Sequence, residues 1–166
     1  MHIVYLFALF GTFGVPAEVI SHIQAIYEQL NGNVKFIIGD NANFDSSLNK
    51  LFASLGYSKN VVVYSLGYVK HNDFGLPTKV FSTEFIADKN ELHIKSPDGT
   101  LLEIIDNVKS EDEAKLSIEY NSFLDKQLVN DCTFAICCYD GTTKKTFNTV
   151  NRLKILNKYV YIYGTK

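Results

Sequence analysis

The chain has 166 residues, with 16 Lys+Arg against 18 Asp+Glu, so its formal net charge is −2. This length suits one domain that buries about 70% of its unfolded surface, so the chain needs neither a disulfide nor a structural metal to fold. Near-zero net charge argues against a general nucleic-acid binder, which needs a dominant basic face. A hydrophobic fraction of 46% argues against a disordered chain.

The cysteines and the first apolar run indicate the compartment. Cys132, Cys137 and Cys138 are an odd number, and we expect free, mostly buried thiols in a reducing cytoplasm. Cys137 and Cys138 are neighbours on a predicted strand and point to opposite faces, so they do not hold a metal jointly. The apolar run from residue 3 to residue 10 is too short to span a bilayer and lacks a basic segment before it. We therefore predict a cytoplasmic protein without membrane association.

The first part of the chain alternates apolar runs with helix-period segments. Unbroken hydrophobicity in the runs predicts strands that are covered on both faces, and an apolar stripe recurring every three to four residues predicts the helices. In chain order, we predict a strand over His2–Leu9, a helix from Pro16 to Asn31-Gly32, a strand over Val34–Ile38, a helix over Phe44–Leu55 that stops at Gly56, and a strand over Asn60–Ser65.

The middle of the chain has a different pattern. Two short apolar segments, Glu91–Lys95 and Thr100–Ile105, flank a Ser-Pro-Asp-Gly turn, which predicts a β-hairpin with positive φ at Gly99. An acidic helix follows from about Ser110 to Val129, and its first residues resemble a capping box. The last predicted elements are a strand over Thr133–Cys138, a helix over Thr143–Leu156 and a strand over Tyr159–Tyr163. The alternation of strands and helices implies right-handed crossovers and a parallel sheet.

Candidate ligand-binding residues follow from this topology, because ligands of open parallel sheets bind beyond the carboxyl ends of the strands. Small residues in those loops let backbone N–H groups approach a ligand, and hydroxyls add donors beside helix N-termini. The candidates are Gly11, Thr12, Gly39, Asp40, Asn43, Asp45, Ser65, His71, Asn72, Asp140, Gly141, Thr142, Thr143 and Thr146.

Several of these residues have two interpretations. Lys144 and Lys145 stand in the first turn of a helix, where the dipole favours acids; they either add positive potential for a phosphate or are solvated surface charges. Asp40 and Asp45 are either catalytic carboxylates or structural, and Asp45 is placed to bind free N–H groups near its helix start. Asn43 suits a left-handed turn.

Histidines and known motifs give no further site. His71 is a lone loop histidine, either catalytic or an ordinary loop residue, and His22 flanks the apolar stripe of the first helix. His2, His22 and His93 lack metal-ligand spacing, so we predict no metal. Dinucleotide-binding, Walker, zinc-protease and nucleophile-elbow motifs are absent from the sequence, so we predict no cofactor.

Three segments together resemble a known family. Residues 39–45 resemble the Gly-Asp-Ala-x-Gly-x-Asp signature of the SLOG superfamily, in its YspA-like branch. Residues 71–75 are similar to that branch's Arg-Asn-Asn-x-Gly, and residues 139–146 resemble its Trp-Asp-Gly-Lys-Ser-x-Gly-Thr motif. The similarity covers most of the chain, apart from roughly residues 81–120. The superfamily is a Rossmann-like group whose ligands are typically nucleotides or nucleotide-derived molecules.

The resemblance sets the predicted architecture. We expect a single SLOG-like Rossmannoid domain over residues 1–166, folded as a Rossmann-like three-layer α/β sandwich. Its five-stranded, mostly parallel sheet would have the order 3-2-1-4-5, with a peripheral β-hairpin insert at about residues 81–120. The resemblance also implies a ligand site on the strand-end residues named above.

Departures from the family pattern bear on activity. Asn43 and Lys145 replace family glycines, Tyr139 replaces a tryptophan and His71 replaces an arginine. The Pro-Gly-Gly-x-Gly-Thr-x-x-Glu signature of the related phosphoribohydrolases is missing, which counts against N-glycosidic hydrolysis and leaves the question of enzymatic activity open.

Three functions remain as hypotheses. The first is binding of a nucleotide or nucleotide-derived small molecule, as a sensor or sequestering protein in a bacterial or phage conflict system such as phage defence. The alternative is a nucleoside or nucleotide N-glycosidic hydrolase that uses Asp40, Asp45 or Asp140. The third is a protein-interaction module with a decayed site. Homo-oligomerisation is left open.

Overall fold

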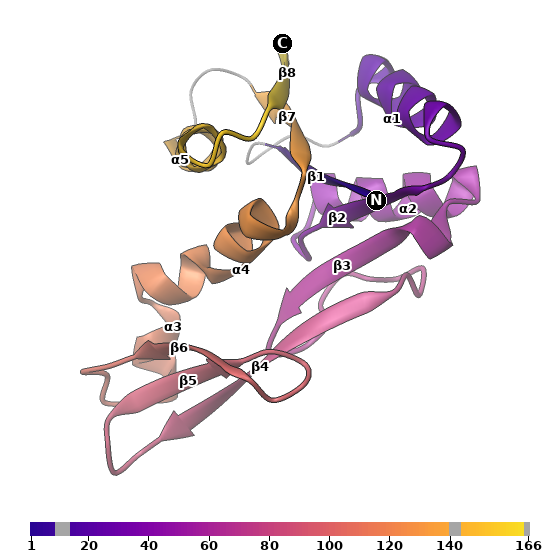
Figure 1. Cartoon of the computed structure of the whole chain (residues 1–166). Helices are drawn as coiled ribbons and strands as arrows, with labels where there is room; N and C mark the ends of the chain where they lie inside the picture. The colour runs from indigo at the N-terminus through magenta and orange to yellow at the C-terminus, as the bar shows by residue number, and fades with distance from the viewer. Residues whose placement is uncertain (9–13, 140–143, 165–166) are drawn as a thin grey trace.

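The computed structural model describes residues 1–8, 14–139 and 144–164 (Figure 1). In chain order the elements are β1 (His2–Ala8), α1 (Ala17–Gln29), β2 (Val34–Ile38), α2 (Phe44–Leu55), a short 3-10 turn (Ser58–Asn60), β3 (Val61–Leu66), β4 (Thr78–Ile86), β5 (Glu91–Lys95), β6 (Leu101–Ile105), α3 (Glu111–Lys115), α4 (Ile118–Asp131), β7 (Phe134–Tyr139), α5 (Lys144–Ile155) and β8 (Val160–Gly164).

The sheet is larger than predicted. It contains eight strands in the order β6-β5-β4-β3-β2-β1-β7-β8, so the expected count of five and the expected order for the whole sheet are wrong. The five predicted strands stand side by side as β3-β2-β1-β7-β8, all parallel. The predicted hairpin forms as β5 and β6 at one edge of the sheet, outside the parallel core as expected, but it is joined to the sheet through β4.

The strand that sequence reasoning missed is β4. Its first residues, Thr78 to Phe81, pair in parallel with β3, and its later residues, Ser82 to Ile86, pair antiparallel with β5. Along this strand Phe81 is buried, whereas Ser82 and Glu84 are exposed. Because β4 is exposed at these positions and not covered along its whole length, its sequence lacks the continuous apolar run that marked the other strands.

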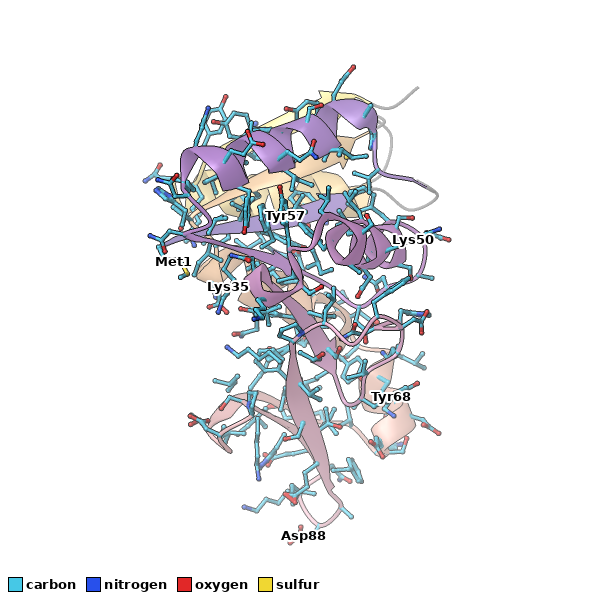
Figure 2. The ribbon with its side chains drawn as sticks, turned by 90° about the vertical axis from the view of Figure 1, so that its right-hand side faces the viewer. Met1, Lys35, Lys50, Tyr57, Tyr68 and Asp88 are labelled. Carbon is cyan, nitrogen blue, oxygen red and sulfur yellow. The ribbon has the colours of Figure 1, made fainter. Side chains whose placement is uncertain are left out.

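Helices cover both faces of the sheet, which gives three layers and is consistent with a Rossmann-like α/β fold. Val4 and Leu6 of β1 face the core beneath α1 and α2, whereas Tyr5 and Phe7 face the core beneath α3, α4 and α5. Figure 1 shows the two helical layers on opposite sides of β1 and β7. The β4–β5 turn with Asp88 lies at the end of the molecule opposite α1 (Figure 2).

The three cysteines are free and buried, as predicted. Cys137 lies in the core beneath α4 and α5, and Cys138 lies in the core beneath α1 and α2, so the expectation of opposite faces is confirmed. Burial raises the pKa of each of these two thiols to about 12, which keeps both protonated at neutral pH.

The acidic segment forms two helices where one was predicted. Ser110 begins α3 by accepting the N–H of Glu113, which confirms the serine half of the predicted capping box. The Glu113 carboxylate accepts the N–H of Lys109 and not that of Ser110, so the other half differs from the prediction. Ser117 then accepts the N–H of Tyr120 and begins α4 as a separate helix. Serine at this position offers the backbone an alternative to a continuous helix, and this explains the break.

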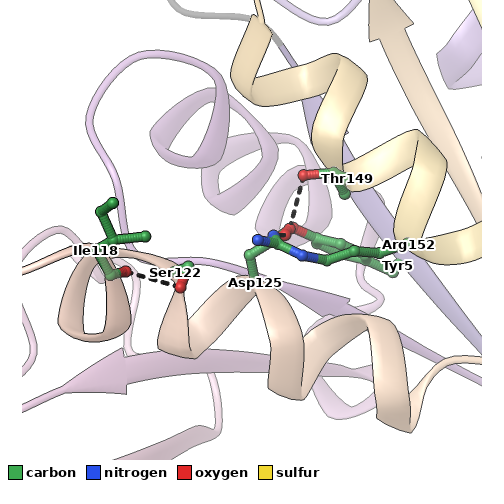
Figure 3. A network of polar contacts seen from close by, with 6 residues as sticks. All are labelled: Tyr5, Ile118, Ser122, Asp125, Thr149 and Arg152. Atoms are coloured by element: carbon green, nitrogen blue, oxygen red, sulfur yellow. Dashed lines mark hydrogen bonds and ion pairs between the residues drawn. The ribbon is translucent and has the colours of Figure 1, made fainter. Parts of the chain in front are cut away.

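A polar network fixes α5 against the sheet. Asp125 of α4 accepts hydrogen bonds from the Tyr5 hydroxyl at 3.0 Å and from Thr149 Oγ1 at 2.9 Å, and it also pairs with Arg152 (Figure 3). One turn earlier on α4, the Ser122 hydroxyl donates to the Ile118 carbonyl. Burial, followed by the charge of Asp125, raises the pKa of Tyr5 well above its usual value, so the hydroxyl remains a donor. The network therefore joins β1, α4 and α5.

Candidate functional site

The predicted site residues divide into two groups. Gly11, Thr12, Asp140, Gly141, Thr142 and Thr143 lie outside the described residues, as does the side chain of Thr146. The structure places the other seven, which are Gly39, Asp40, Asn43, Asp45, Ser65, His71 and Asn72. These seven come from the loop between β2 and α2, the first turn of α2, the end of β3 and the loop between β3 and β4.

Asp40 joins the two loops. It lies two residues beyond the end of β2, after Gly39, and is only 4% exposed. Its Oδ2 accepts hydrogen bonds from the Ser65 hydroxyl at 2.7 Å and from the Lys70 backbone N–H at 2.6 Å, and its Oδ1 accepts the backbone N–H of His71 at 2.8 Å. The strand-end argument correctly brought Asp40, Ser65 and His71 together. The contact to His71 is made through its backbone and not through its ring.

These bonds favour the structural interpretation of Asp40. Both carboxylate oxygens have donors, and a buried carboxylate with several donors is held in one position. Ser65 is fully buried, and its hydroxyl donates its hydrogen bond to Asp40. The geometry therefore assigns Asp40 and Ser65 to positioning the β3–β4 loop.

Asp45, in the first turn of α2, holds the β2–α2 loop in a similar way. Its Oδ2 accepts the backbone N–H of Asn41 at 3.0 Å, just before α2, and the residue is 8% exposed. The carboxylate also explains Gly39, because a Cβ at that position would lie 3.0 Å from Asp45 Oδ2. Asn43 has φ +68°, which confirms the expected positive φ, but its ψ of −105° lies outside the left-handed helical region. These residues give the loop its shape.

Asn72 closes the β3–β4 loop on itself. Its Nδ2 donates to the Leu76 carbonyl and to Thr78 Oγ1, both at 2.7 Å, and its Oδ1 accepts the Leu76 N–H at 2.9 Å. A side-chain amide whose nitrogen and oxygen both form hydrogen bonds within one loop is typical of a structural residue. His71 as a whole residue is half-buried.

Sequence reasoning missed Asn49 of α2. This residue is 1% exposed, and its Nδ2 donates to the Asp45 carbonyl at 3.2 Å. Its Oδ1 finds no hydrogen-bond partner within the described part of the chain. A buried acceptor of this kind needs a water or a ligand N–H. The available signal was a single asparagine next to Leu48 on the apolar stripe of the predicted helix.

The N-termini of the helices are a second feature of the carboxyl edge of the sheet, where these loops lie. α1 and α2 follow the parallel strands β1 and β2, so both begin at the carboxyl edge of the sheet. Their N-cap residues, Pro16 and Asn43, make no side-chain capping hydrogen bond in the described structure, whereas Ser110 and Ser117 cap α3 and α4. Uncapped N-terminal amides and the positive end of the helix dipole favour an anion. α5 follows the parallel strand β7 and begins at Lys144, so its start belongs to the same edge.

A recess of about 290 Å³ lies elsewhere, between α1 and the strands β7 and β8, and His2, His22 and Tyr161 are among its lining residues. His22 Nδ1 and the Tyr163 hydroxyl share a hydrogen bond of 2.7 Å, and burial lowers the pKa of His22. His22 thus flanks the apolar stripe of α1, as predicted. Because His2 opens β1, this recess is separate from the carboxyl-edge loops.

Across the described ranges, the structure contains no group of three or more His, Cys, Asp and Glu side chains arranged to hold a metal ion. Among the helices described, none has the length and hydropathy to cross a membrane.

Comparisons with protein-family models, with curated proteins and with solved structures find no match to this chain. The resemblance to the SLOG superfamily therefore stays a prediction that rests on the sequence motifs.

Proposed function

We propose that this protein binds a nucleotide or nucleotide-derived small molecule at the carboxyl edge of its sheet. The observation that carries the proposal is the contrast in helix capping among the described residues: the N-cap residues of α1 and α2 at this edge make no side-chain capping hydrogen bond, while α3 and α4 are capped by serines. An oxyanion of the ligand would take the place of the cap. A role as a sensor or sequestering protein in a conflict system rests on the resemblance to SLOG proteins.

The loops at this edge support binding because they are held in place before a ligand arrives. Asp40 ties the β3–β4 loop to the end of β2, and Asp45 ties Asn41 to the start of α2. A site with fixed loops loses less conformational entropy on binding. The buried, unpaired Oδ1 of Asn49 adds an acceptor on the same helix for a ligand N–H or a water.

The hydrolase alternative has less support from these residues. A catalytic carboxylate needs an oxygen available to the reacting atoms. Asp40 uses both of its oxygens to hold Ser65 and the β3–β4 loop. We therefore propose binding without turnover by Asp40.

Calorimetry with a matched pair of variants tests the proposal. Purified protein would be titrated with AMP, ADP-ribose and a cyclic dinucleotide, with adenosine as the control that lacks phosphate. Ser46→Glu places an acid in the first turn of α2, where it competes with a bound phosphate for the same positive potential. Ser54→Glu makes the same charge change at the other end of that helix.

We expect at least one phosphorylated ligand to bind with a Kd below about 100 μM and adenosine to bind about tenfold more weakly. Ser46→Glu should weaken binding of the phosphorylated ligand by about tenfold, and Ser54→Glu should weaken it by less than about twofold. Absence of binding by every phosphorylated ligand, or equal losses in the two variants, would contradict the proposal.

A further inference from the structure

The last strand, β8, is an open edge of the sheet. It pairs with β7 on one side, and no described strand pairs with its other side. Because the Tyr159 carbonyl accepts the Ala135 N–H, the backbone groups of residues 159, 161 and 163 point toward β7. Backbone groups alternate along a strand, so the N–H and C=O groups of Val160, Ile162 and Gly164 point outward.

The side chains of β8 do not protect this edge. Its sequence, Val-Tyr-Ile-Tyr-Gly, has no charge and no proline, and Tyr161 and Ile162 are 40% and 50% exposed. Natural edge strands are usually blunted by lysine, proline or a bulge. The preceding Lys158 does not place its charge at this edge, because its ammonium donates to the carbonyls of Val129 and Asn130 at the end of α4.

The opposite edge, β6, has a different character. It also exposes apolar side chains, including Ile104 at 47%. However, its central residue is Glu103, and its pairing with β5 contains a register irregularity near Lys95. Symmetric pairing of two β6 strands would place Glu103 against its own copy, and like charges directly opposite one another are destabilising. β8 carries no such charge.

We propose that β8 pairs antiparallel with β8 of a second copy of this chain, so that one continuous sheet crosses the dimer. A two-fold axis at Ile162 gives a self-complementary register: Ile162 faces its own copy, and Val160 faces Gly164 of the second copy. All of these residues present outward backbone groups, so each facing pair exchanges both hydrogen bonds. Tyr161 then faces Tyr163 of the second copy, an aromatic cross-strand pair.

The register predicts a specific mutational result. Ile162→Lys sets two like charges against each other at the axis, whereas Ile104→Lys makes the same change at a similarly exposed isoleucine on the other edge strand. In sedimentation velocity, we expect the unmodified chain and Ile104→Lys to be dimers and Ile162→Lys to be a monomer. Circular dichroism would check that each variant is folded.

A charge-complementation experiment tests the axis itself. Ile162→Lys and Ile162→Glu should each be monomeric alone, and an equimolar mixture should form a heterodimer that weakens with added salt. The proposal is overturned if the unmodified chain stays monomeric up to about 100 μM, if Ile162→Lys still dimerises, or if Ile104→Lys abolishes the dimer. A mixture of the two folded Ile162 variants that does not associate overturns the register.

Discussion

At the scale of single residues, acidic side chains of the candidate site accept hydrogen bonds from backbone N–H groups and so fix the conformation of the loops. Asp40 and Asp45 take backbone N–H groups of the two loops, and Gly39 is small because the Asp45 carboxylate occupies the space beside it. Strand-end reasoning from the sequence found these residues because their position after apolar runs is visible there. Their partners were not visible, since the Lys70 and His71 amides come from a loop whose conformation depends on side-chain contacts far away in sequence.

The first prediction at this scale concerns Asp40→Ala. The change removes the acceptor of the Ser65 hydroxyl and of the Lys70 and His71 amides, and buried donors without partners are costly. We expect a loss of about 2 to 4 kcal/mol in the free energy of unfolding, measured by urea titration.

The control for this prediction is Asp73→Ala, an exposed acid in the same loop. It should change stability by less than about 0.5 kcal/mol. Hydrogen exchange of the His71 amide should accelerate in Asp40→Ala alone. Equal stability of the two variants would show that the Asp40 contacts contribute little.

At the scale of elements, the helices depend on caps and on contacts between layers. The sequence signals for α2 and its Gly56 stop were local, so the helix bounds were predicted correctly as Phe44–Leu55. The break between α3 and α4 was missed because the apolar and acidic pattern continues across Ser117. The contacts of Asp125 to β1 and α5 were also missed, since they join residues more than 20 positions apart.

The second prediction concerns the pair Asp125 and Arg152. Asp125→Ala leaves the partly buried Arg152 without its carboxylate and removes the acceptor of the Tyr5 hydroxyl, so we expect a loss of about 3 kcal/mol in stability. Arg152→Met in the same background should cost little more, because the charge it removes is already unpaired.

Urea unfolding of the two single variants and the double variant forms the thermodynamic cycle that measures this coupling. A coupling energy of at least about 1 kcal/mol is expected. Strict additivity of the two losses would mean that the contact in Figure 3 is not a stabilising pair.

At the scale of the whole molecule, the parallel centre was predictable and the extension was not. Continuous apolar runs identified the five strands that became β3, β2, β1, β7 and β8. β4 escaped because its stability comes from two partners, parallel β3 and antiparallel β5, and not from an apolar run of its own. Because β4 was missed, the prediction did not join the hairpin to the main sheet, although its position outside the parallel core is correct.

The adjacent thiols of β7 allow the opening rates of the two helical layers to be compared. Cys137 is covered by α4 and α5, and Cys138 by α1 and α2, although the two residues are neighbours in the chain. Alkylation of a buried thiol needs an opening of the layer above it. If the layers open separately, tandem mass spectrometry after alkylation for increasing times should find the two sites modified at different rates. Identical rates would mean that both layers open in a single global event. The alkylation rates of Cys137 and Cys138 would thus report separately how often each helical layer opens.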